Sequence, residues 1–184
     1  MKLLRVGEKG KEKPAILDGD GKIRDISSHV SDLNPHNLNF ETISKIQSDD
    51  TSSLPEISPG QRVGSCITNP GKFVAIGLNY SDHAAEVGAD IPKEPIMFMK
   101  ATSSMCGPND DVEIVSGSKK LDWEVELGIV IGKEAKHISE DQSQDHILGY
   151  CLVNDVSERE WQIEKMGQWV KGKSHDTYGP TGPY

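Results

Sequence analysis

The sequence lacks the features that mark nucleic-acid-binding, membrane-spanning and secreted proteins. Its 184 residues include 20 Lys and Arg against 29 Asp and Glu, and the formal net charge is −9. The basic residues are scattered, so no cationic patch is available to bind a phosphate backbone. The apolar runs are far shorter than a bilayer span, and the opening Met-Lys-Leu-Leu-Arg lacks the apolar core of a secretory signal. We therefore expect a cytoplasmic protein that binds neither nucleic acid nor membrane.

Cysteine is scarce, and its placement excludes two common uses. The three cysteines, Cys66, Cys106 and Cys151, are odd in number, far apart in sequence and free of C-x-x-C spacing. This pattern argues against a disulfide framework and against a zinc site, and it predicts reduced, structural thiols. The sequence also contains no G-x-G-x-x-G, Walker, H-E-x-x-H or G-x-S-x-G motif, so nothing indicates a nucleotide site.

The first part of the chain predicts a small β unit followed by a helix. Residues 1–32 hold short apolar runs separated by Asp18-Gly-Asp-Gly, which is a strong hairpin signal. Apolar residues then recur at helical spacing between Asn39 and Gln47, and Asn39 is placed to cap that helix.

A change of composition predicts the domain boundary. Between residues 48 and 70 the sequence is rich in Ser, Asp, Pro and Gly, which is typical of a connecting loop. We predict a small N-terminal domain over residues 1–65 and a larger domain over 66–184.

The predicted larger domain opens with a short buried strand over residues 72–77. If the polar segment that follows forms a helical turn, His83 and Glu86 share one face, and the carboxylate can orient the imidazole as a general base requires. His–Glu pairs at this spacing are also common on ordinary helix surfaces. A second strand, over 95–100, ends in Lys100, which either binds an anion or is solvated.

The segment 121–132 reads as a strand that starts half-polar and ends buried. Glu124 and Glu126 point to one face of it, and the other face carries Trp123, Val125, Leu127 and Ile129. Adjacent carboxylates repel, so one pKa rises unless water or a cation compensates; two solvated surface glutamates are the alternative. An apolar strand over 147–153 is followed closely by Asp155, and ligand residues concentrate at such strand ends.

Four segments in this order and spacing resemble the fumarylacetoacetate hydrolase family. They are Gly77-Leu-Asn-Tyr-Ser-Asp-His-Ala-Ala-Glu86, Asp122-Trp-Glu-Val-Glu-Leu-Gly128, Asn154-Asp-Val-Ser-x-Arg159 and Gly172-Lys-Ser174. The resemblance is closest from Lys72 onward. It is greatest to the bacterial branch that contains 2,4-diketo-3-deoxy-sugar-acid hydrolases and proteins labelled ureidoglycolate lyase.

The resemblance implies a Mg²⁺ site, with Mn²⁺ as the alternative, and three carboxylate ligands: Glu124, Glu126 and Asp155. Hard oxygen ligands suit such a cation, which would also relieve the repulsion between them. The other site residues that we predict are catalytic His83, Glu86 and Lys173 and substrate-binding Gln162, Lys100 and Thr177.

The implied reaction is hydrolysis of a carbon–carbon bond in a 2,4-diketo acid, an acylpyruvate or a diketo-deoxy sugar acid. His83, oriented by Glu86, would take a proton from the attacking water, and Lys173 would stabilise charge on oxygen. The products would be pyruvate or another 2-oxo acid and a carboxylic acid. A lyase such as ureidoglycolate lyase, a decarboxylase, an isomerase and a catalytically silent homologue are the alternatives.

The implied fold is mainly β with α/β additions: a rolled, barrel-like mixed sheet, preceded by the small N-terminal domain, in a homodimer. Periodicity alone also allows an α+β sandwich. Family members usually continue beyond a G-P-x-G-P segment with further strands, so we expect a truncated chain.

Overall fold

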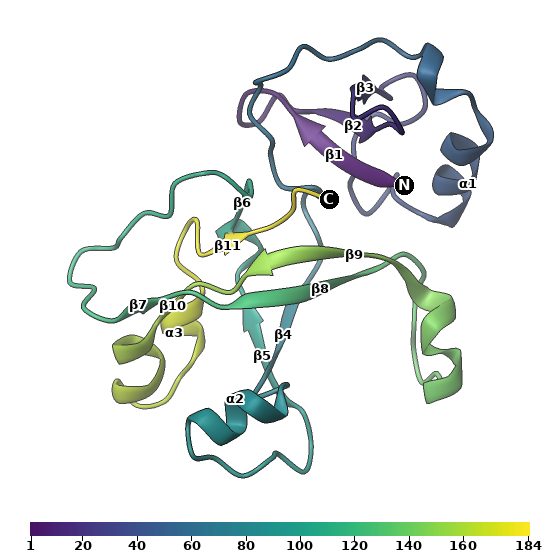
Figure 1. The fold of residues 1–184 in the computed structure, drawn as a ribbon. Helices are drawn as coiled ribbons and strands as arrows, with labels where there is room; N and C mark the ends of the chain where they lie inside the picture. Colours follow the sequence, from purple (N-terminus) through teal and green to yellow (C-terminus); the bar gives the residue numbers. More distant parts are fainter.

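The strands of the protein form several small sheets. The computed structural model describes all 184 residues, with one three-stranded and four two-stranded sheets. Figure 1 shows the N-terminal unit at one end and two hairpins with their helices at the other. The mainly β class with α/β additions is confirmed, but the strands form no closed barrel. None of the helices has the length and apolarity needed to cross a membrane.

The N-terminal unit is an antiparallel meander with a helix packed on it. Strands β1 (Lys2–Val6), β2 (Lys13–Leu17) and β3 (Ile23–Asp25) pair in chain order. The predicted hairpin turn lies between β2 and β3, where the Asp18 carboxylate accepts hydrogen bonds from the backbone N–H groups of Asp20 and Lys22 at 2.9 and 2.8 Å. The sequence signal for this hairpin is therefore confirmed.

The predicted helix is also confirmed, with its cap. Helix α1 (Phe40–Ser48) begins after Asn39, whose side-chain oxygen accepts from the N–H of Thr42 at 2.9 Å. A short 3₁₀ turn, η1 (Thr51–Ser53), follows. The helix closes an apolar core made of Ile16, Ile26, Val30, Leu33 and Ile46.

The first hairpin of the larger part carries a helix at its tip. Strand β4 (Phe73–Gly77) pairs antiparallel with β5 (Ile96–Lys100), so both predicted strands are present. The predicted burial of β4 is wrong, because Val74 and Ile76 are 43% and 39% exposed on an uncovered face of this two-stranded hairpin. Helix α2 (Ser81–Glu86) lies in the connection between them, and η2 (Thr102–Ser104) follows β5.

The second hairpin pairs β8 (Val125–Ile131) with β9 (Ile147–Asn154), and η3 (Glu140–His146) lies at its tip. The predicted continuous strand 121–132 is wrong, because β7 (Leu121–Asp122) pairs separately with β10 (Ser157–Glu158).

Glu124 explains the break between β7 and β8. Its N–H donates to the Asn154 side chain at 3.2 Å, and its carbonyl accepts from the Asp155 N–H at 2.9 Å. These two bonds replace regular ladder pairing and place Glu124 beside Asp155.

The burial of β8 is the reverse of the prediction at its C-terminal end. Ile131, expected to be buried, is 59% exposed, and Leu127 and Ile129 on the same face are 57% and 53% exposed. A two-stranded hairpin covers neither of its own faces, and no element of the chain packs on this one. Glu126 lies on the opposite, less exposed face.

The last segment brings the C-terminal end of the chain close to its N-terminal end. The π-helix η4 (Glu160–Glu164) and helix α3 (Val170–Lys173) lead to β11 (Gly179–Pro180), which pairs parallel with β6 (Met105–Cys106). The two ends of the chain meet where Lys2 Nζ donates to the Tyr184 hydroxyl at 3.1 Å (Figure 1).

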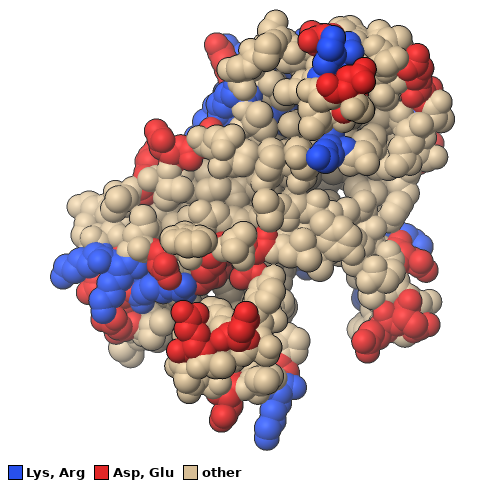
Figure 2. All heavy atoms as spheres, viewed as in Figure 1, with Lys and Arg blue, Asp and Glu red and all other residues tan.

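An arginine joins the N-terminal unit to the rest. Arg62 makes two hydrogen bonds to Asp110, at 2.6 and 2.7 Å, and a third to Glu12 at 2.7 Å. On the surface, acidic side chains gather on the lobe around α2 and on the arm that carries η3 (Figure 2). A hollow separates these two projections.

Candidate active site

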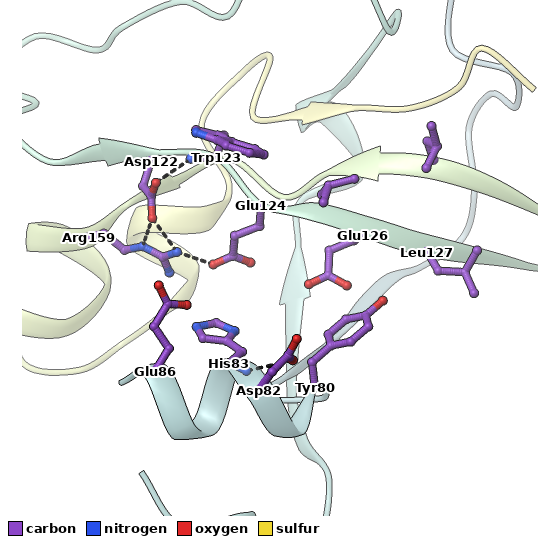
Figure 3. A pocket seen from close by; sticks show the side chains of 12 residues that line it. Tyr80, Asp82, His83, Glu86, Asp122, Trp123, Glu124, Glu126, Leu127 and Arg159 are labelled. Carbon is purple, nitrogen blue, oxygen red and sulfur yellow. Dashed lines mark hydrogen bonds and ion pairs between the residues drawn. The ribbon is translucent and has the colours of Figure 1, made fainter. Parts of the chain in front are cut away.

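Helix α2 presents the predicted catalytic pair to a pocket. The chain turns sharply between β4 and α2 at Leu78, which has a positive φ of 49°. His83 and Glu86 both line the pocket, and Figure 3 shows them pointing from α2 toward the opposite strand. No hydrogen bond joins the imidazole to the Glu86 carboxylate, so the orienting contact predicted from their spacing is not formed in this structure.

The pocket has an acidic wall. Its volume is about 570 Å³, and it lies between α2 and the β7–β8 segment. It is lined by Tyr80, Asp82, His83, Glu86, Asp122, Trp123, Glu124, Val125, Glu126, Leu127, Leu152 and Arg159. Glu124 and Glu126, two of the three predicted metal ligands, are therefore on its surface.

Asp155 lies behind that wall and is 4% exposed. Its carboxylate is shared between two buried lysines: Lys100 Nζ lies 2.6 Å from Oδ1, and Lys173 Nζ lies 2.8 Å from Oδ2. Lys173 also contacts both carboxylate oxygens of Glu124 at 3.1 Å. One ammonium group thus bridges two of the predicted metal ligands.

Lys100 is fully enclosed, with 1% of its surface exposed. Besides Asp155 it donates to the backbone carbonyls of Val156 and Lys173, so all three of its N–H groups are used. Burial lowers the pKa of Lys100, although Asp155 opposes that effect. The lysine therefore holds the carboxylate and the Lys173 backbone in place.

Arg159 forms the cationic edge of the pocket. Its guanidinium lies 2.8 Å from Asp122 and 2.5 Å from Glu124, and it donates to Gln162 Oε1 at 3.0 Å. Figure 3 shows this group between Asp122 and Glu124, above Glu86.

Glu126 differs from its neighbours because no lysine or arginine contacts it. Its one hydrogen bond comes from the Asn79 amide at 3.3 Å. Burial raises the pKa of Glu126, and the nearby Glu124 and Asp155 carboxylates raise it further. The site is therefore short of positive charge at this position.

The donor set suits a hard divalent cation. Three carboxylates supply only oxygen ligands. The raised pKa of Glu126 reflects burial first and then repulsion from Glu124 and Asp155, and a bound cation would relieve this repulsion. In this structure no three His, Cys, Asp or Glu side chains converge closely enough to hold an ion, because Lys173 lies between Glu124 and Asp155.

The predicted substrate-binding residues do not line the acidic pocket. Gln162 is 3% exposed and bonded to Arg159. Thr177 is 8% exposed, and its hydroxyl accepts from the Glu113 N–H at 2.8 Å. Lys100 instead borders a second cavity, of about 880 Å³, that also touches Glu126 and Asp155. Their role in substrate binding stays a prediction.

Several residues that line the pocket were not predicted as site residues from the sequence. Arg159 is one of them, although its place close to the acidic residues Asp155, Glu158 and Glu160 is a signal in the sequence. Tyr80 and Trp123, which are 43% and 70% exposed, carry no periodic signal that marks them as pocket residues.

Comparisons with known proteins indicate the family and the fold that this chain resembles. Residues 72–184 match the family model for the C-terminal domain of fumarylacetoacetate (FAA) hydrolase. A protein of Burkholderia lata, provisionally named a hydrolase, is 56% identical over 184 residues, which are all of this chain and 65% of the relative.

Two solved structures are also similar. The fumarylacetoacetate hydrolase of Exiguobacterium antarcticum has a TM-score of 0.78 at 26% identity, and the match covers all of this chain and 65% of that one. The 5-carboxymethyl-2-hydroxymuconate delta-isomerase of Mycobacterium smegmatis has a TM-score of 0.73 at 29% identity, with 100% and 64% covered. The chain thus spans about 65% of the length of its curated relatives.

Proposed function

Since this chain belongs to the fumarylacetoacetate hydrolase family, we propose that its acidic pocket serves a divalent-metal-dependent hydrolysis of a 2,4-diketo acid. The observation that carries the proposal is the placement of His83 opposite Glu124 and Glu126 across one pocket, with Asp155 directly behind. A base and an anionic oxygen cluster on facing walls are what hydrolysis of an enolisable diketone needs.

Glu124, Glu126 and Asp155 would hold Mg²⁺ or Mn²⁺, and such an ion supplies Lewis acidity toward the substrate oxygens. Lys173 offers a positive charge beside Glu124 and Asp155, where negative charge on a substrate oxygen would be stabilised. Arg159 is the cation on the pocket surface and would contact the substrate carboxylate.

His83 would act as the general base. It takes a proton from a water molecule, and the oxygen of this water attacks the distal carbonyl carbon of the substrate. The bond between that carbon and the neighbouring methylene then breaks, which leaves a carboxylic acid. The methylene carbon takes up a proton to give the methyl group of pyruvate, or the corresponding group of another 2-oxo acid. Water is consumed and no redox change occurs.

The test uses the protein stripped of metal with a chelator. An acylpyruvate is added with and without Mg²⁺, and pyruvate is measured. We expect pyruvate only when Mg²⁺ is present, and we expect Glu126→Gln to abolish it while the fold is retained, because the substitution removes one anionic ligand. Pyruvate formation that is independent of metal, or unchanged activity of Glu126→Gln, would overturn the assignment.

Isomerisation of an unsaturated 2-oxo acid is the second candidate. It is favoured by the similarity to the Mycobacterium smegmatis isomerase. The same carboxylates and His83 would move a proton between two carbons without adding water. An ultraviolet absorbance change without pyruvate release would identify this reaction.

A further inference from the structure

The fold brings together two of the three cysteines that are far apart in the sequence. Cys66 precedes β4 and Cys151 lies in β9, yet they pack in one buried cluster with Val153. They are 5% and 6% exposed. We propose that Cys66 and Cys151 form an oxidation site, a dithiol that hydrogen peroxide converts into an intramolecular disulfide.

The backbone holds both cysteines against the same segment. The N–H of Cys66 donates to the carbonyl of Thr181 at 3.4 Å. The N–H of Gly182 donates to the carbonyl of Leu152, next to Cys151, at 2.9 Å. In the shared cluster the two thiols lie close enough for each to shift the pKa of the other.

The two thiols differ in access. Cys151 borders the 880 Å³ cavity and Cys66 does not, so a small peroxide reaches Cys151 first. The reactive form is the thiolate. Contact with the Cys66 thiol lowers the pKa of Cys151, whereas contact with Cys151 and burial raise the pKa of Cys66, which agrees with Cys151 as the attacking thiol.

The reaction proceeds in two balanced steps. The Cys151 thiolate attacks one peroxide oxygen, so that a sulfenic acid forms on Cys151 and hydroxide leaves. The Cys66 sulfur then attacks the Cys151 sulfur; the S–S bond forms, the S–OH bond breaks, and the Cys66 proton leaves with the departing hydroxide as water. Two thiols are oxidised, and one hydrogen peroxide is reduced to two molecules of water.

Cys106 is a matched internal control. It is also 5% exposed, but its Sγ donates to the carbonyl of Thr177 at 3.4 Å rather than to a thiol. Burial raises the pKa of Cys106 to about 11. It therefore has neither a thiol partner nor the thiolate character that the reaction needs.

The disulfide would link the segment that precedes β4 to strand β9, which is followed directly by Asp155. A cross-link that closes a long loop restricts the unfolded chain, so the oxidised protein is expected to have a higher melting temperature than the reduced protein. The gain should be reversed by dithiothreitol.

The experiment treats the full chain with hydrogen peroxide, blocks the remaining thiols with N-ethylmaleimide, and maps tryptic peptides by mass spectrometry without reduction. Trypsin places the three cysteines in separate peptides, residues 63–72, 101–119 and 137–159. We expect peptide 63–72 joined to 137–159, two hydrogens lighter than the separate peptides, and N-ethylmaleimide on Cys106 alone.

Two cysteine variants test which thiols form the cross-link. Cys106→Ser should still form the cross-link, and Cys151→Ser should form none. A wild-type protein that keeps three free thiols, while its urea-unfolded form is oxidised, would overturn the proposal. A cross-link to Cys106, or sulfinic acid on Cys151 without a cross-link, would also overturn it. The wild-type measurement decides the matter even where a variant fails to fold.

Discussion

The N-terminal unit and the hairpin part of the molecule distribute their residues in opposite ways. In the N-terminal unit the interior is apolar: Ile26, Leu33 and Ile46 have no exposed surface. In the hairpin part the most enclosed groups include charged side chains, and Lys100 and Lys173 are each 1% exposed. Many of its large apolar side chains are exposed to solvent; Trp123, for example, is 70% exposed.

The two regions are therefore stabilised by different interactions, namely apolar burial in the N-terminal unit and buried ion pairs in the hairpin part. Apolar burial stabilises the first region by roughly 25 cal/mol per Å² and needs no partner of defined geometry. Buried charges stabilise the fold only when each one is paired. When one partner is lost, the desolvation cost of the other charge is no longer compensated. The region that holds the candidate active site is thus the region that depends most on individual pairs.

The largest expected effect comes from Lys100→Met. It leaves Asp155 with one lysine in a buried site, and breaking such a pair costs about 3–5 kcal/mol in the free energy of unfolding. Urea unfolding measures it. Lys22→Met is the control, because the Lys22–Glu56 pair is exposed and contributes less than about 1 kcal/mol. Equal losses in both variants would remove the distinction between the regions.

Ile46→Ala tests the apolar region. The substitution leaves a cavity in a core where Ile46 has no exposed surface, and we expect a loss of about 2–5 kcal/mol with no change in activity per folded molecule. The control, Ile129→Ala, removes a side chain that is 53% exposed and should change the unfolding free energy by less than about 0.5 kcal/mol. A similar loss in the control would show that the β8 face is covered in solution.

His83→Asn should lower turnover about 100-fold or more, which is the usual contribution of a positioned base and equals about 2.7 kcal/mol in the barrier. Stability should not change, because α2 is a short surface helix. Glu86→Gln should have a smaller effect, since no hydrogen bond joins Glu86 to the imidazole. Steady-state kinetics measure both; equal losses would show that the two residues act as a unit.

The smallest effect concerns the link between the regions. The hydrogen bond from Arg62 holds the pKa of Asp110 below its ordinary value, with burial opposing it. A carboxyl with a lowered pKa stabilises the fold above its unfolded pKa, and this contribution is lost as pH falls through the folded value. Asp110→Asn should therefore cost about 1 kcal/mol at pH 7, and this cost should decrease as the pH falls below the ordinary carboxyl pKa. A cost that does not change with pH in the acid range would contradict this.

Local signals predicted local structure well. The Asp18 turn and the Asn39 cap were identified because the responsible hydrogen bonds span two to four residues. The placement of Glu124 beside Asp155 was predicted through the family resemblance, and the structure places them side by side through one backbone hydrogen bond.

The remaining features depend on contacts between distant residues. Alternation predicted that Glu126 and Leu127 lie on opposite faces of β8, but not which of these faces other elements cover. The burial of Lys100 requires Asp155 and residue 173, and the meeting of Cys66 with Cys151 requires the segment around Thr181. No local pattern encodes such contacts.

The two lysines also set an order of assembly during folding. Lys100 binds the carbonyl of Lys173, which lies 73 residues further along the chain, and the Lys173 ammonium in turn binds Asp155. Closing such long loops costs entropy before any contact compensates it. The N-terminal hairpins need only short closures. The acidic pocket should therefore be among the last parts of the molecule to become native, and a refolding chain should regain its secondary structure before this pocket forms.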